Sequence, residues 1–161
     1  MRDAERAVIG KRGEDIRRQA LEGASGPLAV MTLGDLKDKL TNTSDVSADV
    51  LTSVGELGKL SDEELSKVLG MARSSLVSGG KLWFVDHAGC TRGLLGFVAS
   101  HVNGEFLTGG FYPGRSLPES IRQAGFIITD IERFTVPTRN PILRPWVQGV
   151  AIVESRSGSR S

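Results

Sequence analysis

The chain is poor in the residues that build disulfides and metal sites. Its 161 residues include one cysteine, Cys90, and two histidines. A single cysteine excludes an intramolecular disulfide, and one Cys with two His does not supply the four ligands of a conventional structural zinc site. We therefore predict no metal site and a reducing, cytoplasmic compartment.

Charge of one sign and long apolar runs are also lacking. Twenty Lys and Arg balance nineteen Asp and Glu, which gives no electrostatic footprint for nucleic acid and no polybasic patch for a membrane. No stretch approaches the ~18–20 apolar residues of a membrane helix, and the first residues carry no apolar signal-like core. We expect no nucleic-acid partner and no membrane span.

The composition that remains is that of one folded unit. A hydrophobic content of 39% is enough for a single buried core. We predict one α/β domain over residues 1–154 and a disordered tail over residues 155–161, SRSGSRS.

The hydrophobic patterns predict alternating strands and helices. A capping box of Ser61 and Glu64 begins the clearest helix, and Ser78-Gly79-Gly80 would end it. The last two strands follow each other directly, which indicates a mostly parallel sheet whose last strand is antiparallel. The expected strands are residues 6–10, 28–33, 48–54, 81–86, 126–136 and 146–154, and the expected helices are residues 14–21, 61–76, 91–102 and 117–124.

Four segments in series carry a family resemblance. They are ADVLTSVGEL, LSDEELSKVLGMARSSLVSGGKLWFVDH, LPESIRQAGFIITDIERFTV and RPWVQGVAIVE. In this order they resemble the carboxyl-terminal half of class I S-adenosylmethionine-dependent methyltransferases, and the last resembles the branch called methyltransferase type 11 or methyltransferase-like. The resemblance implies a Rossmann-like sheet and methyl transfer from S-adenosylmethionine to a small-molecule acceptor.

The same resemblance implies that the chain begins one strand late. Residues 6–10 would be the family's second strand and residues 28–33 its third, so the first strand and its GxGxG loop have no counterpart. Where the second strand usually ends in an acidic residue, the chain has Lys11, or Glu14 if the register slips. With a central strand missing, either the strands close ranks, or a partner chain completes the sheet, or the product is unstable.

The resemblance also implies a set of cofactor-binding residues. Asp35 would accept a hydrogen bond from the adenine amino group, and Leu36 would flank the ring. Val54, Gly55 and Glu56 follow a strand whose carboxyl end would meet both cofactor and substrate. Ordinary turns would equally explain Asp35 and Gly55.

Asp86 and His87 are the candidate catalytic residues. They end a predicted strand beside the expected substrate pocket, and a histidine near its free pKa can accept a proton from a hydroxyl or thiol. A structural loop histidine is the alternative. Cys90 is expected to be a small packing residue, and Trp146 either walls an apolar substrate pocket or packs in the core.

Two functional hypotheses follow. The first is a methyltransferase whose cofactor loop is supplied upstream, and the second is a non-catalytic, methyltransferase-like interaction or scaffold subunit. An enzyme that uses a nicotinamide cofactor is a weaker third hypothesis, because it too needs a glycine loop after a first strand.

Overall fold

The computed structural model describes residues 3–22, 29–42, 45–90, 93–101 and 110–154. The predicted break at residues 24–27, part of the glycine-rich loop at residues 104–114 and the predicted tail lie outside these residues. The helices are α1 (Asp3–Glu22), α2 (Leu33–Asn42), α3 (Asp62–Ser75), α4 (Gly93–His101) and α6 (Leu117–Gln123), with short 3₁₀ helices η1 (Leu57–Lys59) and η2 (Pro141–Leu143). The strands are β1 (Val30–Thr32), β2 (Ala48–Val54), β3 (Leu76–His87), β4 (Phe126–Thr135) and β5 (Pro145–Val153).

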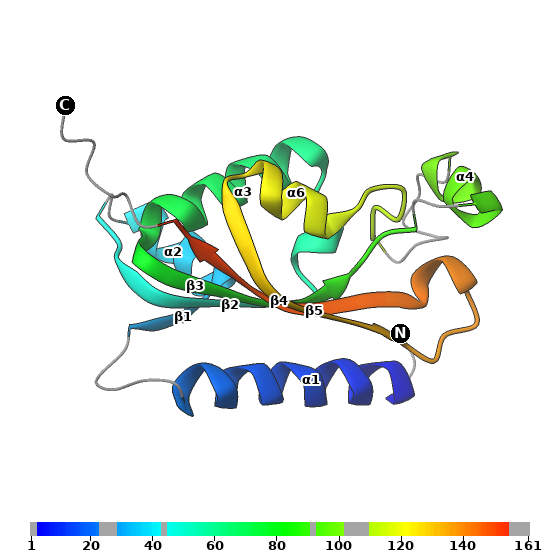
Figure 1. The fold of residues 1–161 in the computed structure, drawn as a ribbon, viewed down its shortest axis with the longest axis horizontal. Coiled ribbons are helices and arrows are strands. Elements are labelled where there is room, and N and C mark those ends of the chain that lie inside the picture. Colours follow the sequence, from blue (N-terminus) through cyan, green and yellow to red (C-terminus); the bar gives the residue numbers. More distant parts are fainter. Residues whose placement is uncertain (1–2, 23–28, 43–44, 91–92, 102–109, 155–161) are drawn as a thin grey trace.

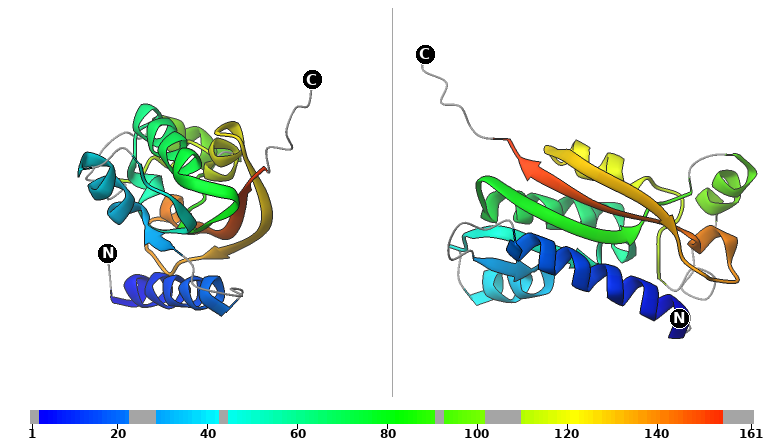
Figure 2. Two further views of the ribbon diagram at one scale, coloured as in Figure 1. Left: turned by 90° about the vertical axis from the view of Figure 1, so that its left-hand side faces the viewer. Right: turned by 60° about the horizontal axis from the view of Figure 1, so that its bottom comes forward.

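The five strands form one sheet in the order β1-β2-β3-β5-β4. β1, β2 and β3 are parallel, whereas β5 is antiparallel to both β3 and β4. Helix α1 lies alone along one face, and α2, α3 and α6 cover the other (Figure 1; Figure 2 shows the same layers from two further sides). The predicted α/β class, with a mostly parallel sheet and an antiparallel last strand, is confirmed.

The strand predicted at residues 6–10 is wrong, because this segment belongs to the 20-residue helix α1. Its buried residues are Ile9, Gly13, Ile16 and Ala20, which recur every three or four positions and so lie on one helix face. Gly13 allows close packing, since a Cβ there would lie 3.1 Å from Val54 Cγ2. Lys11 and Glu14 are therefore helix residues and do not end a strand.

β1 is the neighbour of β2 in the sheet. Residues Val30, Met31 and Thr32 pair directly with Val50, Leu51 and Thr52 of β2 in parallel register. β1 is shorter than the predicted strand 28–33, and Leu33 already belongs to α2. The predicted turn at Gly34-Asp35 is thus the first turn of a helix that the sequence did not predict.

The capping box at the start of α3 is confirmed. The Glu64 N–H donates to Ser61 Oγ (3.3 Å), and the Ser61 N–H donates to Glu64 Oε2 (2.9 Å). The helix ends at Ser75, before the predicted glycine stop, and β3 begins at Leu76. Ser78, Gly79 and Gly80 are consequently part of a strand twice as long as the six residues expected.

The core has two parts, one on each face of the sheet. The larger lies under α2, α3 and α6 and includes Leu51, Leu82 and Phe84, while the smaller lies against α1 and includes Ile16 and Trp146. Among the described residues, no helix is long and apolar enough to cross a membrane, and no group of three or more His, Cys, Asp or Glu is placed to hold a metal ion.

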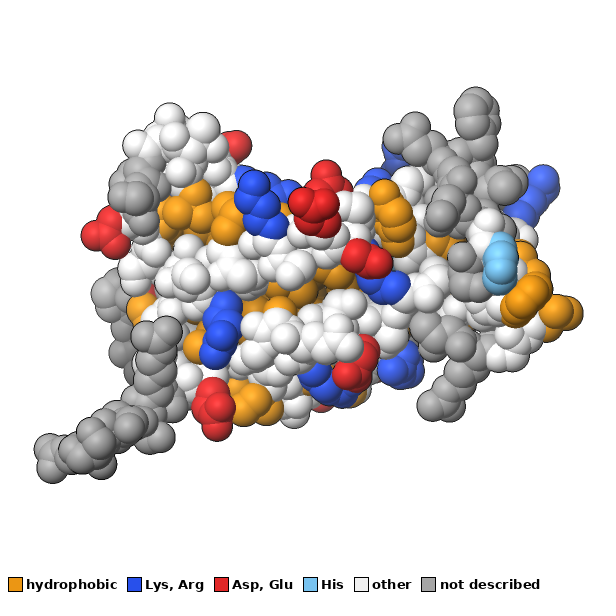
Figure 3. All heavy atoms as spheres, turned by 90° about the horizontal axis from the view of Figure 1, so that it is seen from above, with side chains coloured by type: hydrophobic (Ala, Val, Ile, Leu, Met, Phe, Trp, Pro, Cys, Tyr) orange, Lys and Arg blue, Asp and Glu red, His pale blue; other side chains and the backbone are white. Residues whose placement is uncertain are grey.

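The surface over α3 and α6 mixes acidic and basic side chains, and hydrophobic atoms gather at one end (Figure 3). Helix α4 projects at that end of the molecule (Figure 1). Its exposed apolar residues are Leu94 (78% exposed), Phe97 (65%) and Val98 (39%).

Candidate functional site

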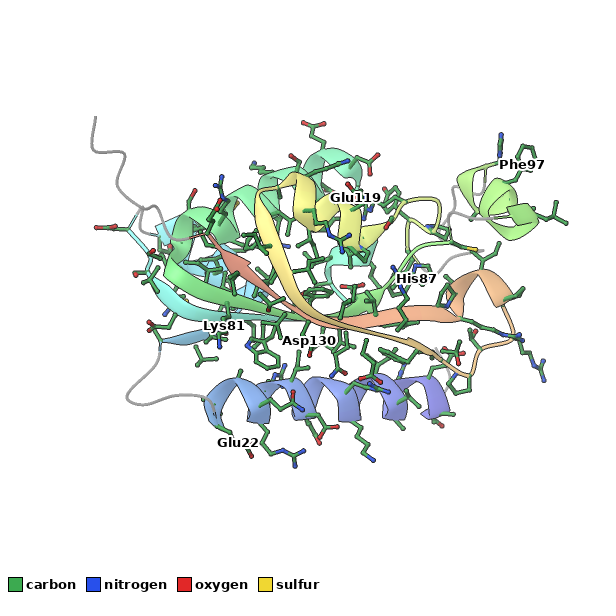
Figure 4. All side chains as sticks on the ribbon, in the orientation of Figure 1. Glu22, Lys81, His87, Phe97, Glu119 and Asp130 are labelled. Atoms are coloured by element: carbon green, nitrogen blue, oxygen red, sulfur yellow. The ribbon has the colours of Figure 1, made fainter. Side chains whose placement is uncertain are left out.

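Parallel strands bring the predicted site residues to one edge of the sheet. Val54 ends β2 and pairs with Val85 of β3. Gly55-Glu56 therefore follow β2 beside Asp86-His87, the last two residues of β3. β1 ends at the same edge, where Asp35 follows in α2. This edge is where ligands bind in open α/β sheets, and His87 marks it in Figure 4.

The carboxylate of Asp86 is completely buried and accepts three backbone hydrogen bonds. Leu57 N–H donates to Oδ2 (2.7 Å), and the N–H groups of Gly58 (3.0 Å) and His87 (2.8 Å) donate to Oδ1. Burial raises the pKa of Asp86 to about 6, because desolvation outweighs the lowering by these hydrogen bonds. Asp86 therefore joins the end of β3 to the loop after β2.

The same loop is held through its carbonyl groups. Arg115 Nη2 donates to the Leu57 carbonyl (3.1 Å), and the Tyr112 N–H donates to the Gly58 carbonyl (2.9 Å). Arg115 Nη1 also pairs with Asp62 (2.9 Å). Both amides and both carbonyls of Leu57 and Gly58 are thus bonded within the chain. No pattern in the sequence points to Arg115, because its partner Leu57 lies 58 positions away.

His87 is buried, and both of its ring nitrogens are hydrogen bonded. The Gly89 N–H lies 3.1 Å from Nδ1, which makes Nδ1 the acceptor, so Nε2 carries the proton and donates to the Ile142 carbonyl at 2.9 Å. Burial lowers the pKa of His87 and favours the neutral ring. Neither nitrogen is free to take a substrate proton unless one of these bonds opens.

Asp35 and Leu36 lie in the first turn of α2. The Asp35 N–H donates to Thr32 Oγ1 (3.0 Å), and the Thr32 N–H donates to Asp35 Oδ2 (3.3 Å), as in a capping box. These bonds with Thr32 hold the pKa of the exposed Asp35 below its usual value. Leu36 is buried in the larger core, so a ring could reach it only if the core opened.

Gly55 and Glu56 differ from the other site residues. Gly55 has φ +66°, which favours glycine, and its N–H donates to the Val85 carbonyl (2.8 Å). Glu56 is half-buried, and its Oε2 is buried with no hydrogen-bond partner among the described residues. Desolvation raises the pKa of Glu56, the charges of Lys37 and Arg17 oppose this, and that of Asp35 adds to it. Val54 packs instead against Gly13 of α1.

The fold is similar to that of a solved methyltransferase. A SAM-dependent methyltransferase from Methanosarcina mazei aligns with a TM-score of 0.50 and 15% identity over 69% of this chain and 61% of its own. An O-methyltransferase family protein from Burkholderia thailandensis aligns with a TM-score of 0.44 and 17% identity over 72% of this chain and 33% of its own. The [4+2]-cyclase SpnF aligns with a TM-score of 0.48 and 16% identity over 69% of this chain and 51% of its own. The chain has the Rossmann-like fold of class I methyltransferases.

This likeness concerns the fold alone. No family model and no curated protein sequence matches the chain. The chain also spans between 33% and 61% of the length of these three structures. Because one fold hosts many chemistries, the activity must be argued from the site.

On this methyltransferase-like fold, aromatic rings surround His87. The His87 ring lies 5.6 Å from Phe111 and 6.2 Å from Trp146, measured between centroids. Trp146 is buried beside Phe134, over which the Arg12 guanidinium lies at 4.3 Å from the ring centroid. The tryptophan thus packs in the smaller core.

Two surface hollows have volumes of about 470 Å³ each. One runs between α3 and α6 and is lined by Ser66, Arg115 and Ser120 among others. The second lies near Arg73, Ser78 and Glu154. Neither is lined by a residue that the sequence predicted for the site.

Proposed function

We propose that the protein takes part in S-adenosylmethionine-dependent methyl transfer to a small-molecule acceptor. The observation that carries the proposal is the fold, a five-stranded sheet in the order β1-β2-β3-β5-β4 that aligns with a SAM-dependent methyltransferase at a TM-score of 0.50. The sequence-predicted residues also gather at the edge of this sheet where ligands bind.

The residues proposed to hold the cofactor are Asp35, Leu36, Val54, Gly55 and Glu56. Gly55 and Glu56 fit such a ligand best. Gly55 has no side chain that would block a ligand, and Glu56 Oε2 is buried without a hydrogen-bond partner among the described residues. When bound, S-adenosylmethionine would supply an electrophilic methyl group. The chain's part is to orient the ligand and to exclude water.

Asp86 and His87 remain the proposed groups for a proton on the acceptor. For His87 to act as the base, the hydrogen bond from the Gly89 N–H to Nδ1 must break, because the other ring nitrogen, Nε2, already carries a proton. Asp86 would have to exchange at least one of three amide donors for the substrate. These conditions favour positioning as the main contribution to catalysis.

A second candidate is a non-catalytic interaction or scaffold subunit. It is favoured by β1, which continues directly into α2 through the Thr32–Asp35 cap without a glycine-rich turn. The outer edge of β1 carries no further strand in the described part of the chain, so a partner chain could pair there.

Titration calorimetry with S-adenosylhomocysteine separates the two candidates. Saturable 1:1 binding by the 161-residue chain supports the cofactor site. Its loss in a Gly55→Val variant that keeps the wild-type circular dichroism spectrum and a cooperative unfolding transition would indicate that the ligand binds at this edge. A matched control is Gly70→Val on α3, where a Cβ meets nothing within 4 Å. No heat of binding at millimolar ligand would rule out cofactor use by this chain.

A further inference from the structure

Four acidic or basic side chains meet at the candidate edge, and three of them are already bonded within the chain. Asp86 has three amide donors, His87 is bonded at both ring nitrogens, and Asp35 is bonded to Thr32. Glu56 is the exception, because its buried Oε2 has no partner in the part of the chain that the structure describes.

The backbone on both sides of Glu56 is fixed. The Gly55 N–H is bonded to the Val85 carbonyl, and the Leu57 N–H is bonded to Asp86 Oδ2. Gly55 also has the left-handed φ that a side chain would strain. The backbone position of Glu56 is therefore set by hydrogen bonds within the chain.

The charges around Glu56 do not replace a bonded partner. Lys37 and Arg17 are near enough to favour its ionised form, but neither forms an ion pair with it among the described residues, and Asp35 opposes them. A buried carboxylate oxygen without a donor costs free energy. A hydrogen-bond donor from a bound ligand would remove this cost.

We infer that Glu56 is the ligand-binding carboxylate of this edge and that it receives a hydroxyl, amino or ammonium group of a small molecule. This inference rests on the proposed function for where the ligand lies. It assigns the polar contact to Glu56 and leaves Asp86 and His87 as the residues that hold the site in shape. The donor group can belong to the cofactor or to the methyl acceptor, and the second test below separates these two sources.

The first test needs no ligand. Glu56→Gln and Glu56→Met are compared with the wild type by thermal unfolding at pH 8, with Glu63→Gln on the exposed start of α3 as control. Removing an unpartnered buried charge should raise the unfolding midpoint, by about 2–4 °C for Glu56→Met, and leave the control unchanged. A lower midpoint for both Glu56 variants would show an internal partner and overturn the inference.

The second test separates the two sources of the donor. If the wild type binds S-adenosylhomocysteine and Glu56→Gln weakens this binding tenfold or more while Glu63→Gln does not, the cofactor supplies the donor. If binding is unchanged, methylammonium is titrated into the ligand-free chain while the Glu56 carboxyl ¹³C signal is followed. A saturable shift assigns the donor to the acceptor, and no shift overturns the inference while the proposed function stands.

Failure of the proposed function gives a different result. A wild-type chain that binds no S-adenosylhomocysteine would refute methyl transfer by this chain. The unfolding comparison and the methylammonium titration then decide on Glu56 alone, because neither depends on the cofactor.

Discussion

Gly58 lies against the carboxylate of Asp86 so closely that a Cβ at position 58 would be 2.6 Å from Asp86 Oδ1. The same Cβ would be 2.9 Å from Phe111 Cδ1. The absence of a side chain at Gly58 is therefore what lets the loop after β2 place two amides on Asp86. This contact joins the ends of two strands and shapes the candidate edge.

Gly58→Ala should destabilise the protein by about 1–3 kcal/mol, because the Cβ must displace a buried carboxylate or an aromatic ring. Gly70→Ala is the matched control, since Gly70 lies inside α3 and its Cβ would meet nothing within 4 Å. The control should be stabilised by roughly 0.5–1 kcal/mol. Urea unfolding measures both, and equal effects at the two sites would contradict the packing seen at Gly58.

Asp86→Asn should lower stability most at acidic pH. The folded pKa of Asp86 is raised to about 6 from 3.8, so its contribution is fully present below about 3.8 and is lost as the pH rises through 6. Asn has no such titration. The stability gap between wild type and variant should narrow between pH 4 and 7.5, by roughly 3 kcal/mol at most. A gap that widens would mean that the three amide bonds outweigh burial.

His87 should be neutral at pH 7 with its proton on Nε2. Burial lowers its pKa, so the neutral ring contributes stability above the unfolded pKa of about 6.5 that is lost as the pH falls through the lower folded value. Ring ¹⁵N shifts report the tautomer, and His87→Gln identifies the signal and should flatten the stability profile below pH 6.5. A proton found on Nδ1 would contradict the bond from Gly89.

Arg115→Gln should cost about 1–2 kcal/mol, mainly through the lost bond to the Leu57 carbonyl. Asp62→Asn serves as the control for the ion pair, because the Asp62 side chain is 88% exposed while that of Arg115 is 13% exposed. An exposed pair contributes roughly 0–1 kcal/mol. Guanidinium unfolding of the two single variants and of the double variant measures the contribution of the ion pair and that of the bond to the Leu57 carbonyl. Equal losses in both single variants would assign the effect to the ion pair.

Several local features follow from neighbouring residues alone. The Ser61–Glu64 capping box begins α3 because both of its hydrogen bonds are formed within four residues. The strand at residues 48–54 is as predicted, and the two directly joined last strands indicated the antiparallel end of the sheet. Local hydrogen bonding and strand order along the chain are enough for these.

The amino-terminal elements depend on tertiary packing. Residues 6–10, RAVIG, form a short apolar run that is compatible with a strand or with part of an amphipathic helix. The packing of Ile9, Gly13 and Ile16 against the sheet stabilises the helix. Likewise, β3 is longer than the predicted strand 81–86 because of its pairing partners. Leu76 pairs with Ala48 of β2, and His87 pairs with Trp146 of β5.

The candidate edge shows the same division. The strand patterns in the sequence predict that Asp86 and His87 lie at the end of one strand. They also predict that Gly55 and Glu56 follow the strand before it. Whether these groups are bonded or free depends on partners far along the chain, as between Asp86 and Leu57 or His87 and Ile142. Such contacts arise only when the strands pair and the loops close over their ends, because burial and hydrogen bonding at a site are properties of the packed chain.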